Sequence, residues 1–138
     1  MTKTRKFLIV SHGALAGGFR SALELITGAA GDIIVLQAYV EENVPVEEEL
    51  SRLLQGAGVE EEWVVFTDLL GGSITNQVLR VMAGLPGHDA IHIVAGVNLA
   101  LVIEVVLGDR ETPVTELLPE AVSRAREQLV YVNGIING

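Results

Sequence analysis

Two kinds of segment alternate along this chain of 138 residues. Short runs that are almost entirely apolar are typical of strands buried on both faces, and they lie at 7–10, 33–40, 63–67 and 90–95. Apolar residues recur at helical spacing in the segments 15–26, 46–54, 74–82, 98–107 and 114–128. This alternation predicts an α/β fold, a doubly wound and mostly parallel sheet in the order 2-1-3-4 with helices on both faces.

The C-terminal stretch 129–136 is again rich in apolar residues that favour strands. It follows two predicted helices without a clear crossover pattern. We therefore expect a final strand that is antiparallel or contributed to another subunit. Since the chain shows no linker, repeat or low-complexity tract, we expect a single domain over 1–138.

Composition and charge exclude several classes of protein. Hydrophobic residues make up 49% and charged residues 20%, which excludes a disordered tail, a coiled coil and a collagen-like fibre. Cysteine is absent, which excludes disulfides, thiolate metal sites and a cysteine nucleophile. The net charge of −9 argues against binding nucleic acid or anionic lipid, because phosphate contacts need clustered Lys and Arg. A basic protein partner fits better.

The N-terminal sequence MTKTRKFLIVSHG has too short an apolar run for a signal peptide or a membrane span. The sequence therefore predicts a cytoplasmic protein. A mean hydropathy of +0.44 is high for such a protein, and we attribute it to a large parallel core and a subunit interface.

Polar residues follow three of the predicted strands. Residues 11–13 (Ser-His-Gly) follow the first strand, residues 67–68 (Thr-Asp) and 71–73 (Gly-Gly-Ser) follow the third, and residues 96–98 follow the fourth. Ligands bind outside the carboxyl ends of parallel strands, and the predicted order places these three strands side by side. We therefore expect these polar groups to converge.

His12 and Asp68 are the candidate catalytic residues. A carboxylate bonded to one imidazole nitrogen fixes the tautomer and leaves the other nitrogen free as a nucleophile. The alternatives are a strand-end histidine satisfied by backbone and an aspartate that only caps a turn. A metal site is not expected, because His88 and His92 would lie roughly 13 Å apart along a strand.

Gly13, Gly71, Gly72 and Ser73 are the candidate phosphoryl-binding residues. Glycine lets backbone N–H groups approach an anion, and Ser73 opens a predicted helix whose N-terminus attracts phosphate. Gly-Gly-Ser is also an ordinary turn and helix cap. The chain has no G-x-G-x-x-G after its first strand, no G-x-x-x-x-G-K-[ST] and no G-x-S-x-G, which disfavours dinucleotide-binding, P-loop and α/β-hydrolase folds.

Three blocks, FLIVSHG, VVFTDLLGGS and VAGVNLALVIEVVL, resemble the mannose-type enzyme IIA domain of the bacterial sugar phosphotransferase system (PTS). The resemblance covers residues 6–136. It implies that His12 accepts a phosphoryl group from the phosphocarrier HPr and passes it to a IIB domain. That domain phosphorylates sugar entering through the membrane IIC and IID subunits.

The resemblance also implies the roles of other residues. Asp68 corresponds to the orienting aspartate, and Ser73 to the loop hydroxyl near the phosphoryl group. The family is dimeric, with a C-terminal strand exchanged between subunits, which suits 129–136. The chain has Ile74 and Ala100 where the family commonly has proline.

We therefore predict a phosphoryl carrier that uses no metal or cofactor. Three alternatives remain: the phosphoryl-donor subunit of dihydroxyacetone kinase, a phosphorylated regulatory module with no onward transfer, and a small-molecule binding module without turnover.

Overall fold

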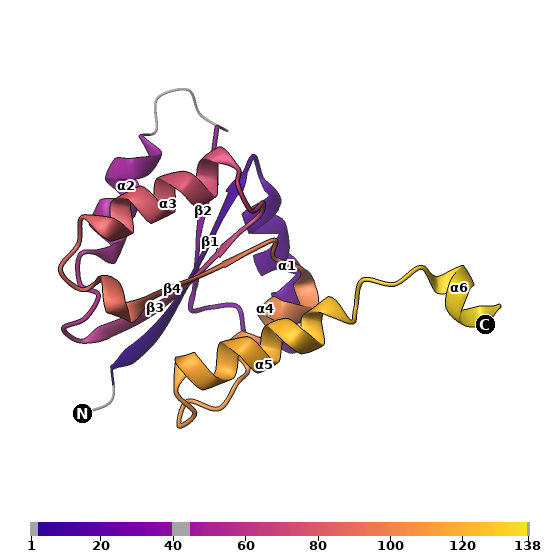
Figure 1. Ribbon diagram of the computed structural model, residues 1–138. Helices are drawn as coiled ribbons and strands as arrows, with labels where there is room; N and C mark the ends of the chain where they lie inside the picture. The colour runs from indigo at the N-terminus through magenta and orange to yellow at the C-terminus, as the bar shows by residue number, and fades with distance from the viewer. Residues whose placement is uncertain (1–2, 40–44, 138) are drawn as a thin grey trace. The chain divides into compact units, whose positions relative to one another are not determined.

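The computed structural model describes residues 3–39 and 45–137, and the chain divides into two compact units, Met1–Val97 and Asn98–Gly138 (Figure 1). The first unit contains β1 (Thr4–His12), α1 (Leu15–Thr27), β2 (Ile33–Ala38), α2 (Val46–Leu54), β3 (Glu61–Thr67), α3 (Ser73–Ala83), the short 3₁₀ helix η1 (His88–Ala90) and β4 (Ile91–Ala95). The second unit contains α4 (Leu99–Val106), α5 (Val114–Arg126) and α6 (Val132–Ile136).

The sheet has four strands in the order β2-β1-β3-β4, and every pair is parallel. The predicted order is therefore confirmed. The register places Val10 of β1 opposite both Leu36 of β2 and Thr67 of β3. The carboxyl ends of these three strands consequently lie side by side at one edge of the sheet, where the loops after β1 and β3 also lie (Figure 1).

Alternate side chains of the central strands bury against opposite faces of the sheet. Leu8, Val10 and Val65 belong to the apolar cluster that α2 and α3 cover. Their chain neighbours Phe7 and Ile9 are equally buried and face the other way. Figure 1 shows α1 on the face opposite α2 and α3. The continuous apolar runs of the sequence are thus explained by a sheet covered on both faces.

The helices begin and end at expected signals. Glu47, Glu48 and Glu49 lie in the first turn of α2, where carboxylates favour the helix dipole. Gly28 ends α1 in the left-handed conformation, with φ 69°, and its N–H bonds to the carbonyl of Glu24. Among the helices of the described residues, none is long and apolar enough to span a bilayer.

In the second unit α4 and α5 pack together. The side chain of Asn98 accepts a hydrogen bond from the Leu101 N–H at 2.8 Å and donates one to the Ala125 carbonyl at 2.9 Å. Asn98 thereby caps α4 and ties it to α5. Arg124 of α5 also forms an ion pair with Glu104 of α4.

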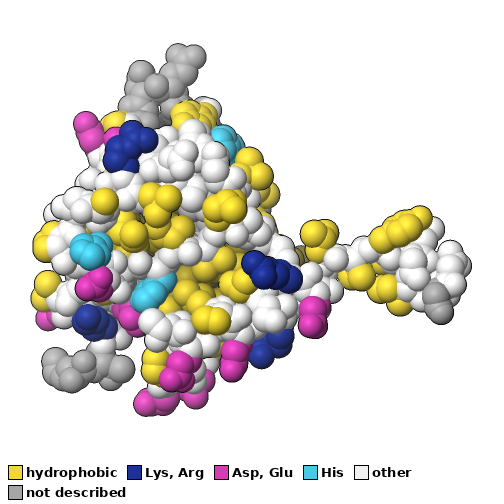
Figure 2. All heavy atoms as spheres, viewed as in Figure 1, with side chains coloured by type: hydrophobic (Ala, Val, Ile, Leu, Met, Phe, Trp, Pro, Cys, Tyr) yellow, Lys and Arg dark blue, Asp and Glu magenta, His cyan; other side chains and the backbone are white. Residues whose placement is uncertain are grey.

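The predicted strand at 129–136 is wrong for the single chain. Residues 129–131 have no regular structure and Val132–Ile136 forms the short helix α6. A strand needs a neighbouring edge to satisfy its backbone, and no described strand pairs with this segment. Local bonds replace the pairing, since the Gly134 N–H donates to the Tyr131 carbonyl at 3.0 Å. The apolar side chains stay on the surface, as Figure 2 shows for the C-terminal segment.

Candidate active site

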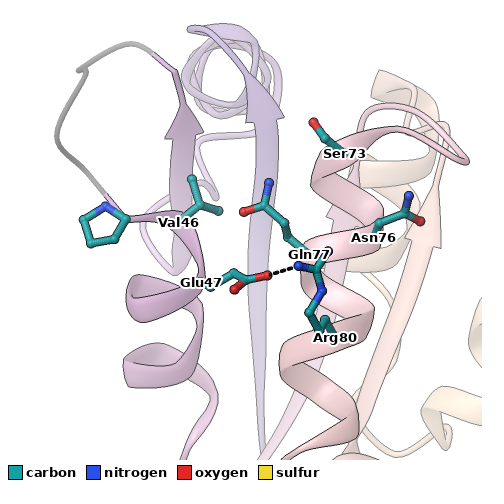
Figure 3. Close-up of a pocket in the computed structure, with 7 residues that line it drawn as sticks. Val46, Glu47, Ser73, Asn76, Gln77 and Arg80 are labelled. Carbon is teal, nitrogen blue, oxygen red and sulfur yellow. Dashed lines mark ion pairs between the residues drawn. The ribbon is translucent and has the colours of Figure 1, made fainter.

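An open groove of about 530 Å³ lies between the start of α2 and the side of α3 (Figure 3). It is lined by Pro45, Val46, Glu47, Ser73, Asn76, Gln77 and Arg80. Glu47 and Arg80 form an ion pair of 3.0 Å that joins the two helices. Because Ser73 and Gln77 line the groove, it opens directly beside the strand-end loops that contain the predicted site.

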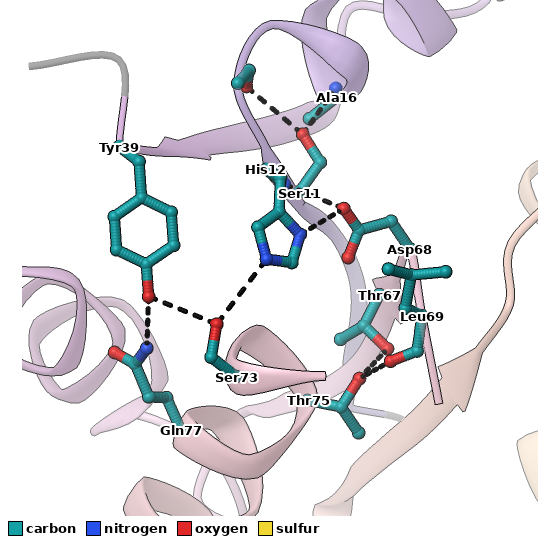
Figure 4. Close-up of polar contacts among 11 residues, drawn as sticks. Ser11, His12, Ala16, Tyr39, Thr67, Asp68, Leu69, Ser73, Thr75 and Gln77 are labelled. Carbon is teal, nitrogen blue, oxygen red and sulfur yellow. Dashed lines mark hydrogen bonds and ion pairs between the residues drawn. The ribbon is translucent and has the colours of Figure 1, made fainter. Parts of the chain in front are cut away.

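His12 is the last residue of β1, and its half-exposed ring contacts Asp68 (Figure 4). The carboxylate oxygen Oδ2 of Asp68 accepts the backbone N–H of His12 at 2.8 Å and lies 2.8 Å from the ring nitrogen Nδ1. The structure thus brings the two predicted catalytic residues together through two contacts to a single oxygen. These contacts fix both the position and the rotation of the imidazole.

The charge of Asp68 decides the tautomer of His12. The Asp68 side chain is only 7% exposed. Burial raises the pKa of this carboxyl, but the backbone N–H and ring of His12 outweigh it and hold the pKa below its usual value. Asp68 is therefore a carboxylate at neutral pH and can only accept hydrogen bonds. In the neutral imidazole the proton of His12 therefore lies on Nδ1, and Nε2 presents a lone pair.

Ser73 faces that lone pair. It is the first residue of α3, and its Oγ lies 3.4 Å from Nε2 of His12. The first N–H groups of a helix have no partner within the helix and carry its positive dipole end. The site therefore combines a nucleophilic nitrogen, a hydroxyl and a helix N-terminus.

The glycines before Ser73 let the loop come close to His12. Gly71 has φ 74°, a conformation that residues with a side chain rarely adopt. A Cβ on Gly72 would lie 3.3 Å from the Leu69 Cβ and 3.8 Å from Cε1 of His12. These two predicted residues thus give close backbone approach at the ring.

Two buried threonines hold this loop in place. The hydroxyl of Thr75 on α3 lies 2.7 Å from the hydroxyl of Thr67 at the end of β3 and 2.6 Å from the Leu69 carbonyl oxygen. Both threonines are almost fully buried. The end of β3, the loop and the start of α3 are therefore fastened together.

Gly13 serves the turn after β1 by its conformation, with φ 56°. Its N–H already donates to the Ala38 carbonyl at 2.8 Å, so this group is occupied. The neighbouring Ser11, fully buried, accepts the Ala16 N–H at 2.8 Å through its hydroxyl oxygen. Ser11 thus ties the start of α1 to the strand end that carries His12.

Sequence reasoning missed Tyr39 and Gln77. The hydroxyl of Tyr39 lies 3.2 Å from Oγ of Ser73 and accepts a hydrogen bond from Nε2 of Gln77 at 3.0 Å. The ring centroids of Tyr39 and His12 are 5.7 Å apart. The sequence placed Tyr39 inside the predicted strand 33–40. In the structure β2 ends at Ala38, so Tyr39 follows the strand, and Val40 lies outside the described residues. An aromatic hydroxyl at the end of the strand beside β1 was the available signal.

The other histidines lie in different contacts. His88 is exposed and its ring lies 3.1 Å from Asp89. His92 on β4 lies 3.2 Å from Glu62 on β3.

In the stretch 96–98, the Val97 N–H donates to the Thr67 carbonyl at 3.1 Å. Across residues 3–39 and 45–137, no three acidic or histidine side chains gather in a way that could hold a metal.

Comparison with known proteins identifies the family of this chain. The family model EIIA-man, described as the PTS system fructose IIA component, matches residues 6–122. A solved structure from Klebsiella pneumoniae, described as a phosphoenolpyruvate-dependent sugar PTS permease, is 32% identical with a TM-score of 0.87, over 99% of this chain and 96% of that one. The mannose/sorbose-specific IIA subunit of Enterococcus faecalis is 26% identical with a TM-score of 0.77, over 92% and 93%.

A search of curated proteins gave no match. The family match nevertheless spans most of the chain and includes all the residues that meet at His12. The resemblance seen in the sequence is thereby confirmed. The chain belongs to the EIIA-man family, the mannose-type IIA components of the phosphotransferase system, and is a phosphoryl-carrier component of a sugar PTS.

Proposed function

We propose that His12 carries the phosphoryl group, accepting it on Nε2 from HPr and passing it to a IIB domain. The observation that supports this most is the double contact of His12 with Asp68. It keeps the proton on Nδ1 and leaves the Nε2 lone pair facing Ser73. The His12 side chain is 41% exposed, so a partner's phosphohistidine has access to it.

The transfer needs no proton movement at His12. The lone pair of Nε2 attacks the phosphorus of the donor phosphohistidine, the donor's N–P bond breaks, and its electron pair returns to the donor ring. A ring that holds both the Nδ1 proton and the phosphoryl group is positively charged. The carboxylate of Asp68 stabilises that charge, and onward transfer to the acceptor side chain of IIB reverses these steps.

The phosphoryl oxygens would be held by groups that already surround Nε2. Ser73 supplies a hydroxyl, and Gly71 and the first turn of α3 supply backbone N–H groups and the positive end of the helix dipole. The Gly72 N–H donates to the Leu69 carbonyl at 3.4 Å and would have to exchange this long bond for one to a phosphoryl oxygen. Gly13 contributes the turn that presents His12. Phosphoryl transfer gains mostly from such positioning and charge stabilisation.

The family implies HPr and IIB partners in general. For this chain we further propose indirect coupling through IIB to membrane IIC and IID subunits, action at the cytoplasmic side, and a homodimer formed through 129–136. We also propose that the two compact units make one domain, because the family match at 6–122 runs through both.

The test is labelling by phospho-HPr. Wild-type protein should take up the label and His12→Ala should not, whereas His88→Ala and His92→Ala should label normally. Labelled His12→Ala would refute the assignment. Labelled wild type that cannot pass the group to IIB would indicate a regulatory module, and transfer to dihydroxyacetone kinase would indicate its donor subunit.

A further inference from the structure

We propose that Tyr39 is a positioning residue for phosphoryl transfer, which fixes the direction in which the Ser73 hydroxyl donates its proton. Gln77 in turn holds the hydroxyl of Tyr39 (Figure 4). The inference rests on the proposed role of His12 and adds to it the residues that set the orientation of Ser73.

The charge at one end of this chain of contacts fixes the hydrogen-bond directions near His12. Asp68 is a carboxylate, so in the neutral, nucleophilic form of His12 the Nδ1 atom donates to it and Nε2 can only accept. The hydroxyl of Ser73, 3.4 Å away, therefore directs its proton to Nε2. A hydroxyl has one proton to give, so the contact between Ser73 and Tyr39 must be donated by Tyr39.

The other end of the chain gives the same directions. Nε2 of Gln77 is an amide nitrogen and only donates, so the Tyr39 oxygen accepts from it at 3.0 Å. The proton of Tyr39 is then available for Oγ of Ser73 at 3.2 Å. Five side chains from β1, α3 and the ends of β2 and β3 thus form one ordered series: Gln77, Tyr39, Ser73, His12 and Asp68.

Core packing does not explain the position of Tyr39. Its side chain is 62% exposed, so little apolar surface is buried by placing the ring here. Its backbone has φ 67°, and it is the one described residue other than glycine with positive φ. That conformation is unfavourable for a bulky side chain, and such residues concentrate at functional sites. We attribute this backbone conformation to the contacts that the Tyr39 hydroxyl makes with Ser73 and Gln77.

The series has a consequence once a phosphoryl group occupies Nε2. The nitrogen no longer accepts, so Ser73 turns its proton to a phosphoryl oxygen while its own oxygen still accepts from Tyr39. Without the Tyr39 hydroxyl, Ser73 is free to rotate and to bond to water instead. Tyr39 should therefore matter for transfer only as long as Ser73 has a hydroxyl.

A double-mutant cycle tests this dependence. The variants are Tyr39→Phe, Ser73→Ala and the pair together, with Ser21→Ala on α1 as a control that removes an exposed hydroxyl. The rate of transfer from phospho-HPr and the hydrolysis rate of the phosphorylated protein are measured for each. Tyr39→Phe should slow transfer about 2- to 10-fold, the range expected for one neutral hydrogen bond. The double variant should match Ser73→Ala alone.

The outcomes separate the two proposals. Transfer by Tyr39→Phe at the wild-type rate would overturn the positioning role and leave His12 as the acceptor. Equal slowing by Tyr39→Phe with and without the Ser73 hydroxyl would also overturn it, because Tyr39 would then act independently of Ser73. A wild-type protein that phospho-HPr does not label would refute the proposed function, and the role of Tyr39 with it.

Discussion

Asp68 is the residue on which the rest of the site depends. Its charge sets the tautomer of the neutral His12 ring, and the tautomer sets the directions of the contacts from His12 to Ser73 and from Ser73 to Tyr39. Asparagine has nearly the same shape, but its amide can donate to Nδ1 and favour the wrong tautomer. We expect Asp68→Asn to fold and to slow transfer from phospho-HPr by roughly 10²-fold or more, since a comparable change in a serine-protease triad costs about 10⁴-fold.

The same variant should change the pH dependence of stability. The fold lowers the pKa of Asp68, so it favours the charged form. Its stabilisation is complete above the aspartate pKa of the unfolded chain, about 3.9, and is lost as the pH falls through the lowered folded value. Urea denaturation at several pH values should show a smaller acid loss in free energy of unfolding for Asp68→Asn than for wild type. Equal transfer rates and equal acid losses would reduce Asp68 to a loop cap.

At the residue scale the sequence predicted the contact between His12 and Asp68 but not the residues around it. His12 and Asp68 could be paired because strand ends in a parallel sheet converge. The place of Tyr39 in the site could not be predicted. The apolar run 33–40 continues past the end of β2, so the sequence gives no sign that the backbone turns into the left-handed conformation at Tyr39. The role of Gly13 also could not be predicted in full, because only the structure shows that its N–H donates to the Ala38 carbonyl and is not free for an anion.

The adjacent Gly17 and Gly18 in α1 make a matched pair at the scale of the element. A Cβ on Gly18 would meet nothing within 4 Å, so Gly18→Ala should raise the free energy of unfolding by about 0.5–1 kcal/mol. A Cβ on Gly17 would lie 2.6 Å from Oε1 of Gln37, which accepts the Gly17 N–H at 3.1 Å. Gly17→Ala should therefore gain less or lose stability, as thermal or urea unfolding would show.

Most helices and strands could be predicted because the spacing of their apolar residues matches the faces that they bury in the fold. The helical spacing of apolar residues at 46–54 falls on α2 (Val46–Leu54), and the third strand ends at Thr67 as predicted. The strand predicted at 129–136 does not form in the single chain, because a strand needs a neighbouring strand edge to pair with and the residue composition does not show whether one is available. Within one chain its backbone bonded locally instead.

At the scale of the whole molecule, the exposed C-terminal segment supports the proposed homodimer. Leu129, Tyr131 and Ile136 are 88%, 77% and 75% exposed. A second subunit would bury these side chains. We expect the full chain to sediment at twice its mass, and a chain lacking 129–138 to become monomeric or to aggregate.

Removal of 137–138 alone is the control for that deletion and should leave the dimer intact. A stable monomer of the full chain in sedimentation equilibrium, at concentrations used for labelling, would contradict the proposal.

The site joins residues that lie far apart along the chain. Asp68 and Ser73 are 56 and 61 positions from His12, and they reach it only because β3 pairs with β1. The entropy cost of closing a loop of this length has to be met before the contacts stabilise the pairing, so such strand pairs form late and slowly. A chain with its helices formed but β1 and β3 still apart would have a histidine without its carboxylate or its hydroxyl. On the proposed role of His12, a chain could therefore receive the phosphoryl group only after β1 and β3 have paired, and chains that are still folding would not react with the donor.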